Sequence, residues 1–223
     1  MTAPLLALLQ LSDSGFPSGS FTHSYGLEQA LNQRWLSGAD EVEAFVRSVI
    51  KQSAATGDAR ACYAASVASG QFDMTVLKET DVALFRTKAA CELREACVQT
   101  GRRLIEETLI HIEAPVMRAY AESVAAGNAP GCHPVAFGAI AGALGVEATE
   151  AASALLQSNT NALLQAAMRL GRISHRDAQA ILHRLRPAVA VQDYSGGPFQ
   201  AYHPLQEIAS MRHQRAEARL FAS

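Results

Sequence analysis

The sequence predicts an all-α protein, folded as a single compact domain of about eight to ten helices. Hydrophobic residues make up 49% of the 223 residues, only 6% are aromatic, and the apolar residues are rich in alanine and leucine. Alanine and leucine favour helices because they lose little side-chain freedom there. Apolar residues recur at helical spacing, and no segment of useful length alternates as a strand would. A core of this size needs no disulfide or structural metal.

The clearest helix begins near Asp40, where apolar residues recur at i, i+3, i+4, i+7 and i+8. They are Val42, Phe45, Val46, Val49 and Ile50.

A second helix is predicted from about Ala89 to Ile110. Its apolar positions include Leu93 and Leu104, and a charged face that carries Glu92 and Glu95 lies opposite them. Pro115 marks the point where this helix has ended or where the next begins.

The main loop of the chain is expected at Gly127 to Pro134, which combines glycines and prolines that break helices. Helices are predicted after it at Val135 to Gly145 and at Thr149 to Leu170. Gly138 and Gly142 form a GxxxG pattern, which in a stretch too short to span a membrane favours the close approach of two helices.

A further helix is predicted to open with a capping box formed by Ser174 and Asp177. It should run to about Leu185, because Pro187 would stop it. The segment Val189 to His203, with two glycines and a proline near its centre, is expected to be a mobile loop.

Composition excludes several classes of partner. With 19 Lys and Arg against 21 Asp and Glu, the formal charge of −2 gives no broad attraction for nucleic acid. No apolar stretch approaches the roughly 20 residues that span a bilayer, so no membrane contact is expected. The four cysteines form no CxxC pair and no signal peptide is evident, so reduced thiols and a cytoplasmic location are expected.

Neither a nucleotide loop nor a catalytic centre is expected. The glycine-rich stretch Ser14 to Leu27 has no lysine and cannot be a Walker loop, so it is interpreted as a turn before a helix capped by Ser18 or Ser20. The chain has no GxSxG motif, and its histidines are scattered rather than spaced as metal ligands. We therefore expect no catalytic residue, no metal site and no cofactor.

Four blocks in order along the chain together resemble the urease accessory protein F (UreF) family. They are LLQLSDSGFPSGSFTHSYGLEQAL (8–31), ELREACVQTGRRLI (92–105), HPVAFGAIAGALGV with the helix that follows (133–170), and IASMRHQRAEARLFAS (208–223). Gln214 and Ala222 depart from the family's usual pattern.

The resemblance implies a helical UreF-like domain at residues 1–203 and a tail at 204–223 that becomes ordered when a partner binds. By composition alone that tail would be a solvated end. The resemblance further implies a homodimer that binds urease accessory protein D (also called H), recruits the accessory GTPase G, and acts with them on apo-urease. Such a complex supports GTP-dependent nickel insertion, and a scaffold of this kind needs surfaces rather than nucleophiles.

The resemblance also points to partner-binding residues at the two ends of the chain. Tyr25 and Arg219 are expected to shape the surface that receives the GTPase, acting as one contact. A second hypothesis makes the protein a regulator of the GTPase that supplies an arginine from among Arg102, Arg103, Arg212 and Arg219. The complete set of expected partner-binding residues is Tyr25, Glu28, Met211, Arg212, His213, Arg219, Leu220, Phe221 and Ser223.

Overall fold

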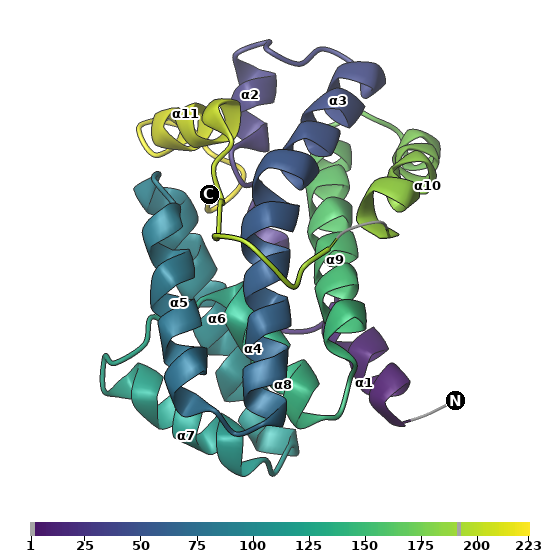
Figure 1. Ribbon diagram of the computed structural model, residues 1–223. Helices are drawn as coiled ribbons and strands as arrows, with labels where there is room; N and C mark the ends of the chain where they lie inside the picture. The colour runs from purple at the N-terminus through teal and green to yellow at the C-terminus, as the bar shows by residue number, and fades with distance from the viewer. Residues whose placement is uncertain (1–2, 191–192) are drawn as a thin grey trace.

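The computed structural model describes residues 3–190 and 193–223, and within these ranges the chain is helical with no strand. The α3, η2 and α4 segments run on as one continuous helix, so the described residues form ten helices and one short 3₁₀ turn (Figure 1). The prediction of fold class is confirmed. No described helix is long and apolar enough to cross a membrane. The elements are α1 (Ala3–Ser12), η1 (Ser20–Thr22), α2 (Leu27–Asn32), α3 (Ala39–Val49), η2 (Ile50–Ala59), α4 (Arg60–Gly70), α5 (Met74–Thr87), α6 (Cys91–His111), α7 (Pro115–Ala125), α8 (His133–Ala143), α9 (Ala148–Arg169), α10 (His175–Ala190) and α11 (Pro204–His213).

The helix predicted near Asp40 begins at Ala39 but continues far beyond its apolar stripe. Residues Ile50–Ala59 wind as a π-helix and lead directly into α4. Stretches of π-helix are rare and recur at functional sites. Here the π segment borders an internal cavity described below.

Helices α4 and α8 pack closely because α8 carries glycines where the two meet, as the GxxxG pattern predicted. A Cβ atom added to Gly138 would lie 2.1 Å from the carbonyl oxygen of Cys62, and one added to Gly142 would lie 2.1 Å from that of Ser66. Any side chain at either position would therefore push α4 away. The contact lies in the first of two core clusters, whose largest fully buried side chains include Tyr120 and Phe137.

The second core cluster lies between α2, α3, α9, α10 and α11. Its members include Leu27 and Phe45 from the first part of the chain, and also Ala209 and Phe221 from the last. Residues after 203 therefore share a core with the body in this structure. Whether they become ordered only with a partner stays a prediction.

The predicted main loop lies between α7 and α8 and is held by a buried carboxylate. Asp81 on α5 accepts hydrogen bonds from the N–H groups of Gly131 (2.7 Å) and Cys132 (2.9 Å), and from the hydroxyl of Tyr120 (2.7 Å). Burial is the main influence on the Asp81 carboxyl and raises its pKa despite these bonds. The N–H groups at the end of the loop thus donate hydrogen bonds to Asp81, a carboxylate that would otherwise be costly to bury.

The capping box at α10 is confirmed. The Asp177 N–H donates to the Ser174 hydroxyl (3.1 Å), and the Ser174 N–H donates to the Asp177 carboxylate (2.9 Å). The predicted end of the helix is wrong, because Pro187 lies inside a helix that reaches Ala190. A proline near the end of a helix removes one internal hydrogen bond, and the packing of Val189 in the second core retains the last turn.

Two other local predictions are corrected. Gly26, not Ser18 or Ser20, is the N-cap of α2. Helix α5, which the periodicity did not identify, begins at Met74 and is capped by Asp73, whose carboxylate accepts from the N–H groups of Thr75 and Val76.

The predicted loop Val189 to His203 starts later than expected, since α10 includes Val189 and Ala190. Residues 191 and 192 lie outside the described residues, and 193–203 contain no helix. This stretch crosses the long α3–η2–α4 helix in Figure 1. The Gln200 N–H donates to the Thr56 carbonyl (3.0 Å), and the Thr56 hydroxyl donates to the Gln200 carbonyl (2.6 Å). The loop thereby leads the chain from α10 to the start of α11.

Candidate partner-binding site at the C-terminal segment

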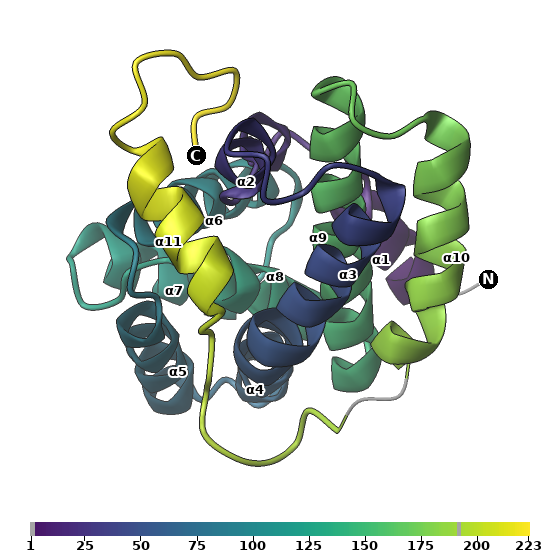
Figure 2. The same cartoon turned by 90° about the horizontal axis from the view of Figure 1, so that it is seen from above.

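The C-terminal segment, defined here as residues 214–223, follows α11 and returns to the body. Figure 2 shows the chain leaving α11, looping outward and ending beside α2. The start of α11 is anchored by His203, whose Nδ1 accepts from the Gln206 N–H (3.1 Å) and whose Nε2 contacts the Ser48 hydroxyl (2.8 Å). Gly26 permits the close approach of α11, because a Cβ atom there would lie 2.9 Å from the Gln206 carbonyl oxygen.

Glu28 on α2 holds the returning chain. One carboxylate oxygen accepts from the Leu220 N–H (2.8 Å), and the other accepts from the Phe221 N–H (3.0 Å) and lies 2.9 Å from Nε2 of His213. The Glu28 side chain is 5% exposed. Hydrogen bonds to a buried charged group contribute more than neutral ones, so this carboxylate is a strong anchor for the segment.

His213 links Glu28 to a second buried carboxylate. Its Nδ1 lies 2.8 Å from a carboxylate oxygen of Glu92 on α6, whose other oxygen accepts from the Ser210 hydroxyl (3.0 Å). The hydrogen bond to Glu92 is the main cause that raises the pKa of His213 above its ordinary value, and Glu28 adds to it against the effect of burial.

The three side chains do not form a metal site. Each imidazole nitrogen faces a different carboxylate, on opposite sides of the ring, so the donors do not converge on one point. No group of three or more His, Cys, Asp or Glu side chains suited to a metal occurs among the residues that the structure describes.

Ser223 is held by the turn before α2. Its carbonyl oxygen accepts from the N–H groups of Ser24 (2.5 Å) and Tyr25 (3.2 Å) and from the Ser24 hydroxyl (2.8 Å). Its own hydroxyl contacts Nδ1 of His23 (2.7 Å). Tyr25 and Gly26 have φ angles of +53° and +83°, so the backbone turns sharply at this point before α2 begins.

An arginine joins this turn to the end of the chain. The Arg169 guanidinium lies 4.1 Å from the ring centre of Phe21 and 4.2 Å from that of Phe221, and it donates to the Phe21 carbonyl. A guanidinium between two aromatic faces gains cation–π attraction on both sides. Phe221 is buried in this contact, whereas Phe21 is 51% exposed.

Other side chains of this region face outward. Leu220 is 60% exposed and Met211 44%, and the Arg219 side chain is 43% exposed with its guanidinium 3.7 Å from Glu92. Arg212 stacks over the Trp35 ring at 5.1 Å. The region therefore joins a rigid inner layer to an outer layer of leucine, methionine and arginine, which is a composition that suits contact with another protein.

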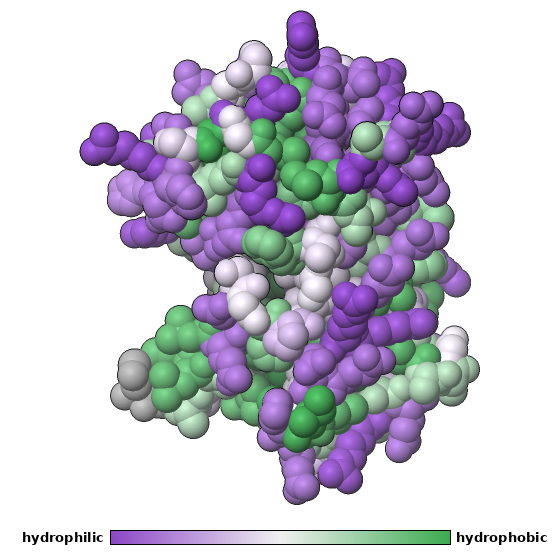
Figure 3. All heavy atoms as spheres, turned by 180° about the vertical axis from the view of Figure 1, so that it is seen from behind, coloured by the Kyte–Doolittle hydropathy of each residue, from purple (hydrophilic) through white to green (hydrophobic). Residues whose placement is uncertain are grey.

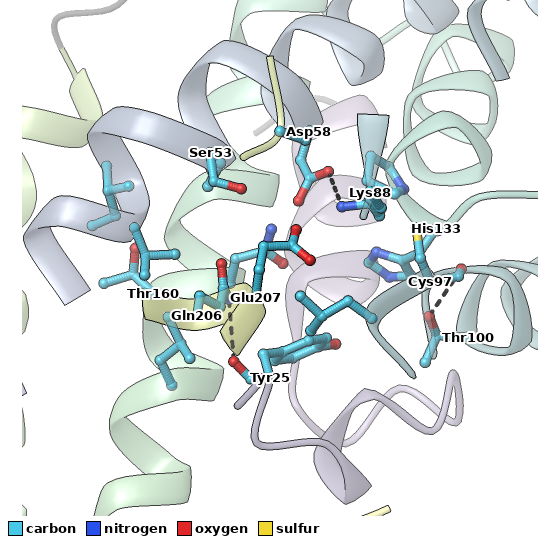
Figure 4. A pocket seen from close by; sticks show the side chains of 18 residues that line it. Tyr25, Ser53, Asp58, Lys88, Cys97, Thr100, His133, Thr160, Gln206 and Glu207 are labelled. Atoms are coloured by element: carbon cyan, nitrogen blue, oxygen red, sulfur yellow. Dashed lines mark hydrogen bonds and ion pairs between the residues drawn. The ribbon is translucent and has the colours of Figure 1, made fainter. Parts of the chain in front are cut away.

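The Tyr25 side chain lines a cavity, and the expectation that it acts as one contact with Arg219 stays a prediction. The described residues contain no hydrogen bond between the two side chains. Tyr25 instead borders an internal cavity with a volume of about 70 Å³ (Figure 4). Its backbone carbonyl accepts from the Gln206 amide (3.2 Å), and burial raises the pKa of its hydroxyl.

The cavity contains a polar wall supplied by several elements. Lys88 and Asp58 form an ion pair of 2.7 Å, and Asp58 comes from the π segment. Burial lowers the pKa of His133 to about 4, which leaves its imidazole neutral at neutral pH. Glu207 accepts from the Ala90 N–H, and burial raises the pKa of its carboxyl. A space of this size and polarity can hold a few ordered water molecules.

The structure therefore brings together most of the residues expected from the sequence. Sequence reasoning missed Glu92, His23 and Arg169, because each acts through a partner more than a hundred positions away. Glu92 requires a correction, since it was assigned to the charged face of its helix and is only 6% exposed. The residues brought together are Glu28, His213, Arg219, Leu220, Phe221 and Ser223.

Comparisons of the sequence with known proteins all match one family. A sequence model of the UreF family matches residues 36–186. The urease accessory protein UreF of Bacillus sp. (strain TB-90) is 32% identical over 98% of this chain and 99% of its own length. UreF 2 of Brucella canis is 32% identical over 97% of this chain and 91% of its own, and UreF of Paenarthrobacter aurescens is 33% identical over 98% and 97%.

Fold and site together define an all-helical protein whose C-terminal segment is held against its body. The comparisons make the assignment more particular: the chain belongs to the UreF family of urease accessory proteins.

Proposed function

We propose that this protein is a non-enzymatic, cytoplasmic scaffold for maturation of the urease metallocentre. In this role it binds accessory protein D/H, recruits the accessory GTPase G, and supports GTP-dependent nickel insertion into apo-urease. Family membership over nearly the whole chain supports the pathway. The observation that carries the scaffold role is the C-terminal segment, which contacts with Glu28, Arg169, Ser24 and Tyr25 hold in place while Leu220 is exposed and Arg219 half-exposed.

The outer layer of the C-terminal region is the proposed contact for these partners. Leucine and methionine supply apolar area, and an arginine offers five donors in a planar fork. Arg219→Ala and Leu220→Asp should therefore weaken recruitment of the GTPase, by roughly tenfold or more for a residue central to the contact. Leu220→Asp should change the protein's own stability little, because Leu220 is 60% exposed. Arg219→Ala also removes a half-exposed charge that lies 3.7 Å from Glu92, so urea denaturation of this variant accompanies the binding assay.

The experiment reconstitutes the complex from purified accessory proteins and measures GTPase capture by each variant. Lys51→Ala on η2 is a suitable control, because Lys51 is exposed and lies outside the C-terminal region. If Arg219→Ala and Leu220→Asp both capture the GTPase as the wild type does, the proposed surface is wrong. Loss of binding to protein D/H with intact folding would instead place that partner on this surface.

The alternative function is regulation of GTP hydrolysis by an arginine supplied in trans. Two candidates are already engaged, since Arg102 donates to the Pro130 carbonyl and Arg212 lies over Trp35. Arg219 is the candidate that belongs to the C-terminal segment; its guanidinium lies 3.7 Å from Glu92 and its side chain is 43% exposed. A GTP turnover assay separates the roles: unchanged turnover in an intact complex leaves the scaffold alone, whereas a fall in turnover with Arg219→Ala supports regulation.

A further inference from the structure

The buried contact between His213, Glu28 and Glu92 has an unusual requirement for protons. Both imidazole nitrogens lie within 2.9 Å of carboxylate oxygens. A neutral imidazole has one N–H donor, so it could satisfy one of these contacts and would turn a lone pair toward the other carboxylate. Two good hydrogen bonds therefore require one additional proton, carried by the imidazole as a cation or by one of the carboxyl groups.

The same carboxylates hold the end of the chain. Glu28 accepts from the N–H groups of Leu220 and Phe221 as well as from His213. Glu92 accepts from Ser210 and lies near Arg219. The carboxylates of Glu28 and Glu92 thus take part both in holding the additional proton and in holding the C-terminal segment.

We propose that the proton shared by His213, Glu28 and Glu92 locks the C-terminal segment, residues 214–223, on the body of the protein, and that its loss at higher pH releases the segment. This inference goes beyond the proposed scaffold role and concerns the isolated chain. It makes presentation of the C-terminal surface depend on pH.

The charges around His213 favour this behaviour. Glu28 faces it from α2, Glu92 from α6, and Arg219 lies beside Glu92 from the C-terminal segment itself. With His213 protonated, two positive groups balance two carboxylates. After the proton leaves, two carboxylates that are 5% and 7% exposed face one half-exposed arginine. An uncompensated buried charge is costly, and opening of the segment lets water reach it.

His23 does not replace the positive charge that His213 loses. His23 lies close enough to Glu92 to feel its charge, but burial and Arg103 lower the pKa of His23. It is therefore neutral in the range where His213 loses its proton, and supplies no second cation.

The direction of the pH dependence follows from linkage. The pKa of His213 is raised in the closed state above its ordinary value of 6.5. The extra stability of the closed segment is therefore complete below pH 6.5 and is lost as the pH rises through the raised value. Between the two values the equilibrium constant for opening should rise about tenfold for each pH unit.

Amide hydrogen exchange of the full chain tests the proposal from about pH 6 to about pH 9, with rates corrected for base catalysis of exchange. Protection of the Leu220 and Phe221 amides should fall with rising pH, while amides in the middle of α9 serve as the internal reference. In His213→Gln the opening constant should be high and independent of pH. His183→Gln, at an exposed position on α10, should behave as the wild type does.

A titration of the wild type by NMR keeps the test independent of whether the variant folds. The His213 ring signals and the Leu220 and Phe221 amide signals should shift with one common midpoint above 6.5. Protection that stays constant across the pH range, or amides that do not follow His213, would overturn the proposal.

Discussion

Glu92 illustrates how far a residue's role can lie from its local sequence. It occupies the first turn of α6, where a carboxylate is favoured by the helix dipole and usually faces water. Local periodicity therefore assigned it to a polar face. Its burial is caused by α11, which places Ser210 and His213 against it, 118 and 121 positions along the chain. No short-range pattern carries that information.

Removing this carboxylate should be costly. Glu92→Ala leaves the His213 Nδ1 and the Ser210 hydroxyl without their buried acceptor, and we expect the free energy of unfolding to fall by about 3–5 kcal/mol. Glu95→Ala, one turn away on the same helix and exposed, should change it by less than about 0.5 kcal/mol. Urea denaturation of both variants measures the difference, and equal effects would mean that the buried contact contributes little.

Glu28, His213, Leu220 and Phe221, which the resemblance implied as partner-binding residues, contact one another in the structure. Their role in binding a partner stays a prediction. Tyr25 lies at the same turn, where its N–H group donates to the Ser223 carbonyl while its side chain borders the cavity.

At the scale of single elements, the sequence predicted those helices whose apolar stripe is long and regular. The start of α3, the extent of α6 and α9, and the capping box of α10 follow from local chemistry. The π segment does not, since its residues IKQSAATGDA have no distinctive propensity. Pro187 was misjudged for a related reason, because tertiary packing outweighs the loss of one hydrogen bond in the last turn.

The close contact of α4 and α8 gives a prediction at this scale. Gly142→Ala inserts a methyl group 2.1 Å from the Ser66 carbonyl oxygen, so the helices must separate and stability should fall by about 1–3 kcal/mol. Gly70→Ala is the matched control, because its added Cβ would lie 3.9 Å from the nearest atom and should stabilise the protein by about 0.4–1 kcal/mol. Thermal unfolding that shows a neutral Gly142→Ala would contradict this account of the packing.

For the whole molecule, the composition correctly indicated a helical body, whereas the partner-binding site that the family resemblance implies stays a prediction. Neither could place the polar cavity, which combines Asp58 from the π segment, Lys88, His133 and Glu207 from four separate parts of the chain. Such a site is defined only when the two core clusters and α11 are assembled. The long α3–η2–α4 helix makes that assembly possible, since its first part packs in one cluster and its last part in the other.

The surface of α1 is the strongest candidate for the homodimer interface that the resemblance implies. Leu8 and Leu11 are buried against the body, whereas Leu5, Leu6 and Leu9 are between 42% and 58% exposed. Figure 3 shows a hydrophobic patch at the lower left of this face of the molecule, below a hollow. In a symmetric dimer the same patch can pack against its copy. Burial of exposed leucines contributes up to about 1.5–3 kcal/mol each.

We therefore expect the double variant Leu6→Glu, Leu9→Glu to shift the protein from dimer to monomer in sedimentation experiments without loss of helical content. Glutamates on the shared face would repel each other and remove apolar area, whereas they cost little at exposed helical positions of a monomer. The control is Val67→Glu, Val76→Glu, which alters half-exposed apolar residues on α4 and α5. A dimer that survives the α1 change but dissociates in the control would move the interface to that second patch, and a monomeric wild type would remove the homodimer altogether.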